Sequence, residues 1–337
     1  MRIVDLNIVW FILITVLFTG FFILEGFDYG VGMMMAGRPK NERAQFVRAI
    51  GPVWDGNEVW MITAGGATFA AFPHVYATMF STFYMALFLM LLALIMRGVA
   101  FELRGQLKYS DWTNFWDFGI MFGSFVPALL WGVAVTNLLR GLPIDYQMHY
   151  VGTFFDLLSP CALLGGIFFM LLFAFHGTNF LLIKIADKGL LHELQQKSLR
   201  LGIATLVAYV LFVSFAAADT DIIEKLSTVI FLGISIGALI TSCASAYSGN
   251  GCKAFLSSTL GIAFLTIGFF NALFPRLMVS SISTEWSLNI YNAASTPHTL
   301  TLMTIAAAIF VPIVLCYQAW SYKIFKERIT PADVHYH

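Results

Sequence analysis

Apolar stretches of about 20 residues recur along this chain from residue 7 to residue 324. A helix that crosses the roughly 30 Å hydrocarbon layer of a membrane needs about that many consecutive apolar residues. Only 11% of the 337 residues are charged, whereas soluble domains carry about a quarter. Inside lipid, helices satisfy their own backbone groups. The sequence therefore predicts an all-α integral membrane protein.

The apolar runs divide into nine predicted transmembrane helices, of which the second is short and rich in Gly and Ala. They lie at residues 7–34, 56–72, 76–100, 116–139, 159–184, 199–217, 226–246, 253–275 and 299–324. No Pro- or Ser-rich linker separates them. We therefore expect a single polytopic membrane domain over residues 1–337.

The basic residues indicate the orientation of the chain. Of the 19 Lys and Arg residues, 15 fall in loops 36–55, 97–115, 184–200 and 247–253 and in the C-terminal tail. The alternate loops hold the other four, which are Arg2, Arg140, Lys225 and Arg276. Because cytoplasmic loops carry the excess of basic residues, the N-terminus is predicted outside and the C-terminus in the cytoplasm.

Acidic side chains interrupt two of the predicted helices. Glu25 and Asp28 lie in the first helix, and Asp55 and Glu58 lie at the start of the second. Acids three residues apart share a helix face, and acids at membrane depth mark ion or proton routes by default. Asp117 starts the fourth helix from the same side. In the predicted orientation these acids occupy the cytoplasmic half, which suits proton uptake from the cytoplasm.

Structural interpretations of the same acids remain open at this stage. Asp28 could cap a loop or pair with Arg38 or Arg43. Asp55 could be the N-cap of the second helix, with Glu58 completing a capping box. An N-cap role would not exclude proton transfer.

Small and aromatic residues surround the acids. Gly26 and Gly30 form a G-x-x-x-G step, and Gly32 follows. Small residues let helix backbones approach closely, so this face is expected to pack against a neighbouring helix. Trp54 and Trp60 flank the second acidic pair and suit packing or an interfacial belt.

Metal and nucleic-acid sites are not indicated. His176 is the only histidine deep in a predicted helix, and no second His or Cys stands nearby at ligand spacing. A hydrogen-bonded interior histidine is therefore favoured, and we expect neither a metal site nor a haem pair on this chain. The net charge is zero and no block of like charges suggests a nucleic-acid partner.

One polar residue lies between the second acidic pair. Asn57 can form a hydrogen bond across helices or hold a water molecule beside the acids.

Several long motifs resemble subunit II of the cytochrome bd-type quinol oxidases. They occur in the family's order and cover most of the chain. The motifs are GFDYGVGMM at 26–34, WDGNEVWMITAGGATFAAFPHVYA at 54–77, RGVAFELR at 97–104, WTNFWDFGIMFGSFVPALLWGVAVTNLLRG at 112–141 and TLTLMTIAAAIFVPIVLCYQAW at 299–320.

This resemblance implies a subunit of a respiratory oxidase in the bacterial cytoplasmic membrane. Such complexes oxidise ubiquinol or menaquinol, reduce dioxygen to water and take the protons from the cytoplasm, which generates membrane potential. The two b-type haems and one d-type haem belong to subunit I, so this chain is implied to carry no catalytic residue. Subunit II consists of two four-helix bundles and one peripheral helix. The resemblance leaves room for small single-helix accessory subunits and for a structural quinone or lipid on this chain.

The family also implies a role for the first acid of the second helix. The acid of the W-D-G-N run, here Asp55, lines a proton route at the subunit interface, with Asp28 nearby. We extend the proton-route role to Glu25, Glu58 and Asp117 by inference from the residues alone. Asn57 is the polar neighbour that could hold a water molecule. A proton-coupled secondary transporter is the alternative from another class, and a purely structural scaffold is a third.

Overall fold

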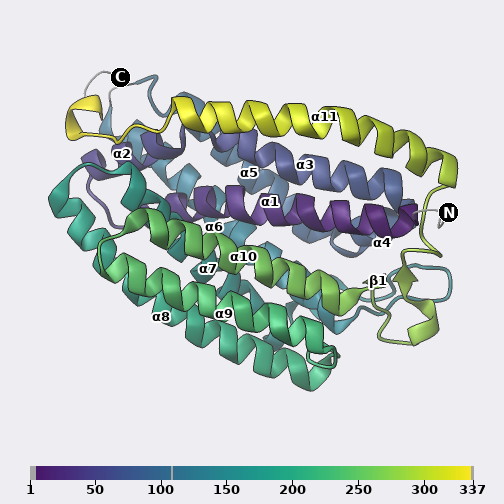
Figure 1. Ribbon diagram of the computed structural model, residues 1–337. Coiled ribbons are helices and arrows are strands. Elements are labelled where there is room, and N and C mark those ends of the chain that lie inside the picture. Colours follow the sequence, from purple (N-terminus) through teal and green to yellow (C-terminus); the bar gives the residue numbers. More distant parts are fainter. Residues whose placement is uncertain (1–4, 108, 335–337) are drawn as a thin grey trace.

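The computed structural model describes residues 5–107 and 109–334 (Figure 1). Within these residues the α-helices are α1 (Leu6–Met34), α2 (Lys40–Ile50), α3 (Trp54–Ala71), α4 (Pro73–Thr82), α5 (Tyr84–Leu103), α6 (Ser110–Arg140), α7 (Pro160–Lys184), α8 (Lys188–Asp219), α9 (Leu226–Tyr247), α10 (Gly251–Leu273) and α11 (Pro297–Ile324). The connections contain short 3-10 helices and the antiparallel strands β1 (Arg276–Met278) and β2 (Leu288–Asn289).

The predicted all-α membrane architecture is confirmed, whereas the count of nine spans is not. Eight helices of the described chain are long and apolar enough to cross a membrane, namely α1 and α5 to α11. The predicted second span corresponds to α3, which has 18 residues and is not among the eight. Its first turns carry Asp55, Asn57 and Glu58, and these polar side chains lower its hydropathy.

Several helix boundaries were predicted wrongly, for local reasons. Helices α8 and α6 begin 11 and 6 residues before the predicted spans 199–217 and 116–139, because their polar first turns extend beyond the apolar runs. The expected span 76–100 is broken at Phe83, whose backbone (φ −94°, ψ 16°) separates α4 from α5. The expected loop 36–55 contains α2, a helix of 11 residues that buries Phe46 and Ile50. It is too short to span a membrane, so a search for long apolar runs does not find it.

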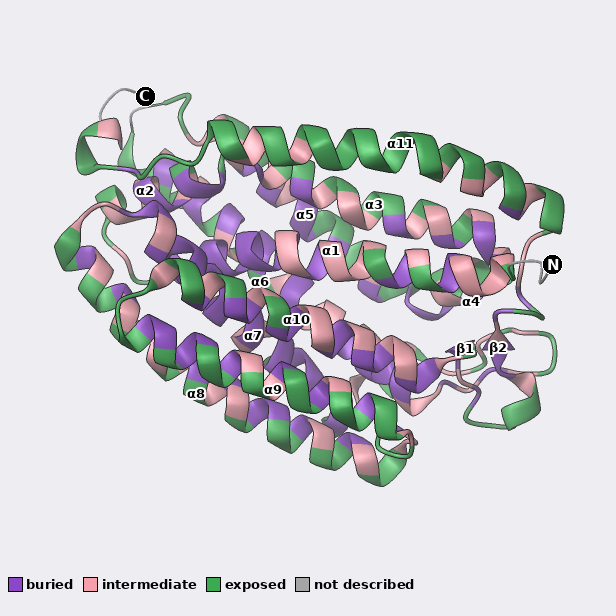
Figure 2. Cartoon of the chain, viewed as in Figure 1, coloured by how far each residue is buried: buried purple, intermediate pink, exposed green. Residues whose placement is uncertain are grey.

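Helix α1 packs against α3, α6 and α7, and α5 packs against α6. Helices α7 to α10 form a ring in which each packs against the next, and α11 lies outside them. In α7, 72% of the most apolar 18-residue stretch is buried, against 6% in α11. Helix α7 is therefore central, whereas α11 lies along α1 and α3 with most of its surface exposed (Figure 2).

Helix α1 begins and α11 ends at opposite ends of the molecule (Figure 1). This arrangement requires an odd number of passes along the molecule, which the eight apolar helices give only together with α3. The prediction of an external N-terminus rests on the basic residues, and Arg97 was wrongly counted among the loop residues. It lies inside α5 with no exposed surface. Without Arg97 the predicted count is fourteen basic residues against four. Of those counted, Arg2 and Lys108 lie outside the described residues.

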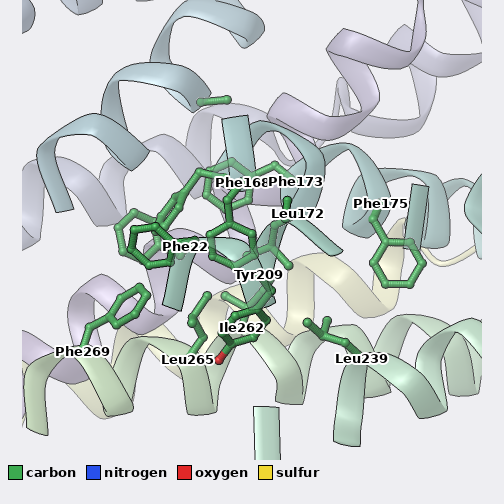
Figure 3. Packing of buried hydrophobic residues seen from close by; sticks show 14 of the residues in the cluster. Phe22, Phe168, Leu172, Phe173, Phe175, Tyr209, Leu239, Ile262, Leu265 and Phe269 are labelled. Atoms are coloured by element: carbon green, nitrogen blue, oxygen red, sulfur yellow. The ribbon is translucent and has the colours of Figure 1, made fainter. Parts of the chain in front are cut away.

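Aromatic side chains fill the space around α7 (Figure 3). Phe168 packs against Tyr209 of α8, with ring centroids 4.9 Å apart, and Phe169 packs edge-on against Phe22 of α1 at 5.5 Å. Lipid tails are as apolar as these rings, so burial alone drives little association between helices in a membrane. The bundle is therefore held largely by close packing of these side chains.

The glycines of the first predicted helix lie where α1 meets its neighbours. A Cβ on Gly30 would overlap the carbonyl oxygen of Phe173 and the backbone of Gly177 in α7. A Cβ on Gly26 would strike the Phe173 ring, and one on Gly32 would strike Ser124 of α6. These positions let α1 approach α6 and α7 at backbone distance.

Gly30→Ala is expected to lower the stability of the folded chain by about 1–3 kcal/mol, because the added methyl group forces two backbones apart. Thermal unfolding of the detergent-solubilised protein measures the loss. The matched control is Gly233→Ala in α9, where a Cβ would meet no atom within 4 Å. Equal unfolding temperatures for the two variants would contradict the close-packing interpretation.

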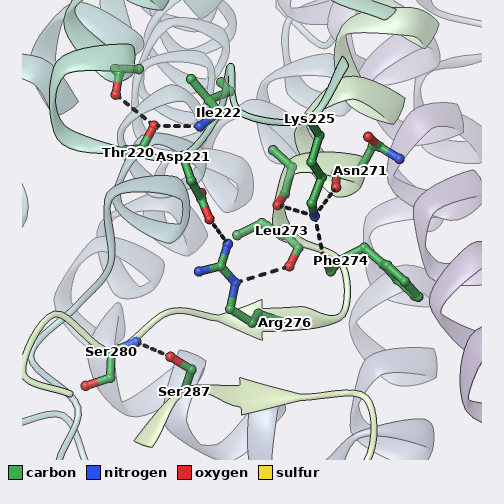
Figure 4. Close-up of polar contacts among 12 residues, drawn as sticks. Thr220, Asp221, Ile222, Lys225, Asn271, Leu273, Phe274, Arg276, Ser280 and Ser287 are labelled. Carbon is green, nitrogen blue, oxygen red and sulfur yellow. Dashed lines mark hydrogen bonds and ion pairs between the residues drawn. The ribbon is translucent and has the colours of Figure 1, made fainter. Parts of the chain in front are cut away.

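A lysine caps the C-terminal end of α10 (Figure 4). The ammonium group of Lys225 donates to the carbonyl oxygens of Asn271, Ala272 and Phe274. Burial and the neighbouring Arg276 guanidinium lower the pKa of Lys225. Arg276 in turn pairs with Asp221 in the turn after α8. These contacts satisfy the last carbonyls of α10 and join the α8–α9 turn to β1.

Candidate functional site

Four buried polar side chains meet at the end of the bundle that holds α2. Helix α1 contributes Glu25 and Asp28, α3 contributes Asn57 and α5 contributes Arg97. Each has a relative exposure of 0%. Buried charges require partners, so the contacts among these four side chains determine what the site can do.

Glu25 forms an ion pair with Arg97. The guanidinium carbon of Arg97 also lies 5.0 Å from the ring centroid of Tyr29 and 5.6 Å from that of Phe101. The faces of such rings attract a cation. The other carboxylate oxygen of Glu25, Oε2, accepts no hydrogen bond from the described residues. Arg97 was missed by the sequence analysis, although the apolar residues 98–101 that follow it are a signal that it lies within the helix.

Asp28 bonds to Asn57 and to neither of the arginines considered for it. Asn57 Nδ2 donates to Asp28 Oδ2 at 2.7 Å, and Oδ1 has no hydrogen-bond partner among the described residues. Arg38 instead pairs with Glu42 and Glu193. The interpretation of Asp28 as a partner of Arg38 or Arg43 was therefore wrong.

Asp55 is not an N-cap, so the predicted capping box is absent from the described structure. The N-cap position of α3 is Val53, which makes no side-chain cap bond. Asp55 lies in the first turn with its side chain exposed. Glu58 follows three residues later on the same face of the helix and is half-buried. Burial therefore increases from Asp55 to Glu58 along α3 and is complete at Glu25 and Asp28 of the neighbouring α1.

Asp117 lies in a separate ion cluster. Helix α6 begins at Ser110, so Asp117 stands about two turns inside it rather than at its start. Arg43 and Arg104 approach its carboxylate oxygens at 2.9 and 2.5 Å. The cluster joins α2, α5 and α6. No hydrogen bond or ion pair of the described residues links Asp117 to the other acids.

The two tryptophans of α3 face other helices. Trp54 stacks on Phe101 of α5, with ring centroids 4.7 Å apart. Trp60 donates from Nε1 to Gln318 Oε1 of α11 at 2.9 Å. Both residues therefore make specific contacts within the protein.

Two residues of α11 reach the site and were missed by the sequence analysis. Gln318 Nε2 donates to Asn57 Oδ1 at 3.2 Å, and the Tyr322 hydroxyl donates to the same oxygen at 2.8 Å. They lie about 260 residues after Asn57, and isolated polar residues near a helix end carry no pattern that predicts this contact.

His176 does not fit a haem ligand, because both of its ring nitrogens are engaged. Nδ1 is 2.7 Å from the Ser258 hydroxyl and Nε2 is 3.1 Å from the Ile23 carbonyl oxygen. Its ring stacks on Phe255. Within the described chain no group of three or more His, Cys, Asp or Glu residues could hold a metal ion.

A cavity of about 680 Å³ lies between α1, α3, α4, α5, α6 and α10. Its walls are almost entirely apolar and include Phe22, Met79, Leu87 and Phe269. Trp131 also lines it, but its indole nitrogen is fully buried and so is not exposed to the cavity. The cavity therefore suits an apolar molecule.

Comparison with known proteins assigns the chain to a family. The family model described as cytochrome bd terminal oxidase subunit II matches residues 6–325. The cytochrome bd ubiquinol oxidase subunit 2 of Bacillus subtilis (strain 168) is 38% identical over 334 residues, which cover 97% of each chain. The cytochrome bd-I ubiquinol oxidase subunit 2 of Escherichia coli (strain K12) is 35% identical over 369 residues, covering 98% of this chain and 96% of that protein.

The fold agrees with this assignment. A chain in the solved structure of bd oxidase from Geobacillus thermodenitrificans superposes with a TM-score of 0.78, covering 95% of this chain and 98% of that one at 14% identity. The transporter alternative is not favoured by these relatives. The eight apolar helices and the bacterial relatives indicate a multi-pass protein of the cytoplasmic membrane. The chain therefore belongs to the family of cytochrome bd terminal oxidase subunit II.

Proposed function

We propose that this chain is the haem-free second subunit of an oxidoreductase complex that oxidises a membrane quinol and reduces dioxygen to water. Its own part is to stabilise the haem-bearing subunit I and to conduct protons to it from the cytoplasm. The observation that carries the proposed proton conduction is the pair of buried carboxyl groups, Glu25 and Asp28. They lie beyond the exposed Asp55 and the half-buried Glu58.

The proposed route enters at Asp55, which is exposed at the first turn of α3. It continues to Glu58 one helical turn further in, and then to the Glu25 and Asp28 carboxyl groups. Glu25 Oε2 and Asp28 Oδ1 accept no hydrogen bond from the described residues, so these oxygens are the atoms on which a proton can be taken up. Asp117 is left out of the route, because two guanidinium groups hold its carboxylate.

The partners follow from the family. Two b-type haems and one d-type haem are assigned to subunit I, in agreement with the engaged nitrogens of His176. Small single-helix accessory subunits and a membrane quinol complete the complex in this proposal.

Asp55→Asn tests the entry of the route. We expect quinol oxidase turnover of the purified complex to fall only a few-fold, because water at an exposed position replaces part of the relay. Haem content and unfolding temperature should stay unchanged. The matched control is Asp111→Asn, an acid in the first turn of α6 that is also exposed. Wild-type turnover in both variants would favour the purely structural scaffold.

We further propose that the apolar cavity holds a membrane lipid or quinone, bound through its apolar chain. Solvent extraction of the purified complex followed by mass analysis distinguishes a quinone from a phospholipid. Leu87→Trp would fill part of the cavity, so bound lipid per complex should decrease. Unchanged lipid content in that variant would contradict the assignment.

A further inference from the structure

The peripheral helix α11 touches the bundle at two separate places. At one end Trp10 Nε1 donates to the Leu300 carbonyl and to Thr304 Oγ1, at 3.2 and 3.0 Å. At the other end Gln318 and Tyr322 bond to Asn57. Every residue from 308 to 317 between these places is exposed. At the Gln318 end two hydrogen bonds from α11 therefore converge on one amide, that of Asn57.

The direction of these hydrogen bonds is determined by chemistry. An indole N–H can only donate, so the Trp60 indole requires the oxygen of Gln318 on its side. The Gln318 amide nitrogen must then face Asn57 and donate to Oδ1. Tyr322 donates to the same oxygen.

The orientation of the Asn57 amide follows from these contacts. With its oxygen held by two donors, its nitrogen faces Asp28 and donates to Oδ2. A flipped amide would place its NH₂ group against the Gln318 NH₂ group and its oxygen against a carboxylate oxygen. Both contacts of the flipped amide would leave buried polar groups unpaired, which is unfavourable.

We propose that Tyr322 and Gln318 are positioning residues of the proton route, which fix the Asp28 carboxyl group through Asn57. This inference rests on the proposed function, because it assigns the two residues a part in the same route. Side-chain amides do not relay protons. The hydrogen bonds from α11 through Asn57 therefore orient the Asp28 carboxyl group and do not conduct protons to it. With Oδ2 held by Asn57, proton exchange at Asp28 is confined to Oδ1.

Tyr322→Phe removes one donor and keeps the ring. The end of α11 should stay in place, because Lys184 independently donates to the carbonyl oxygens of Phe325 and Glu327. Gln318→Met is the second variant, and it removes the link between Trp60 and Asn57. The control is Thr304→Val, which removes a hydroxyl from the other attachment of α11 and leaves Asn57 untouched.

The experiment measures turnover of the whole purified complex in H₂O and in D₂O, together with the KM for quinol. For Tyr322→Phe and Gln318→Met we expect turnover to fall about five-fold, an unchanged KM and a larger solvent isotope effect. Thr304→Val should match the wild type in all three. In an Asp28→Asn background, adding Tyr322→Phe should cause no further loss, because both changes act on one group.

The outcomes separate the two proposals. If Asp28→Asn slows turnover but neither α11 variant does, the positioning role is wrong and the route stands. An additive loss in the double variant, or an equal loss in Thr304→Val, would show that α11 acts through general packing and would overturn the inference. If Asp28→Asn itself retains wild-type turnover, the proposed route fails and the positioning role fails with it.

Discussion

Replacing Arg97 by methionine is expected to destabilise the chain by about 3–5 kcal/mol, because it leaves the Glu25 carboxylate buried without its cation. Methionine is flexible and fills much of the same space, so lost packing contributes little. Little of the chain should accumulate in membranes, and what does should unfold at a lower temperature. Membrane yield and thermal unfolding of the solubilised protein measure both effects.

The double variant Arg97→Met with Glu25→Gln is the decisive comparison. Removing both charges of a buried pair is often close to neutral for stability, whereas removing one is not. The double variant should therefore recover most of the yield lost in Arg97→Met. Arg140→Met provides a matched control, because Arg140 pairs with the exposed Asp219 at the other end of the bundle, where such pairs contribute about 0–1 kcal/mol. Equal losses for Arg97→Met and Arg140→Met would show that the buried pair is unimportant.

The long helices could be predicted from the sequence because each is defined by its own residues. Runs of about 20 apolar residues predicted the eight apolar helices, most to within a few residues at each end. The same criterion fails where a helix is short or polar at one end. Helix α2 has only 11 residues, and α3 begins with the acids of the site. The break at Phe83 depends on local backbone geometry inside an unbroken apolar run.

Part of the site was predictable for the same reason. Glu25 and Asp28 stand out because their neighbours are apolar, and both are fully buried as that pattern suggests. Their partners were not predictable, because pairing depends on how distant helices pack. Arg97 lies near the end of an apolar run and was assigned to a loop. Tyr322 reaches the site only because α11 folds back along α1 and α3.

Replacing Asp28 by asparagine is expected to lower quinol oxidase turnover by about 100-fold, a typical loss when a group that transfers protons is removed. The two side chains have nearly the same shape, and the new amide oxygen can still accept from Asn57 Nδ2. Assembly, haem spectrum and unfolding temperature should therefore stay close to those of the wild type. Turnover at saturating quinol, measured as oxygen consumption by the purified complex, tests the expectation.

Asp28→Glu separates the chemistry from the shape of the side chain. It restores a carboxyl group with one additional methylene, so the proton can be taken up again but at a displaced position. We therefore expect turnover between those of Asp28→Asn and the wild type, with the KM for quinol unchanged in both variants. If Asp28→Asn turned over at the wild-type rate while Asp28→Glu was slow, the position would matter only for packing. Proton transfer at this position therefore requires turnover to decrease in the order wild type, Asp28→Glu, Asp28→Asn.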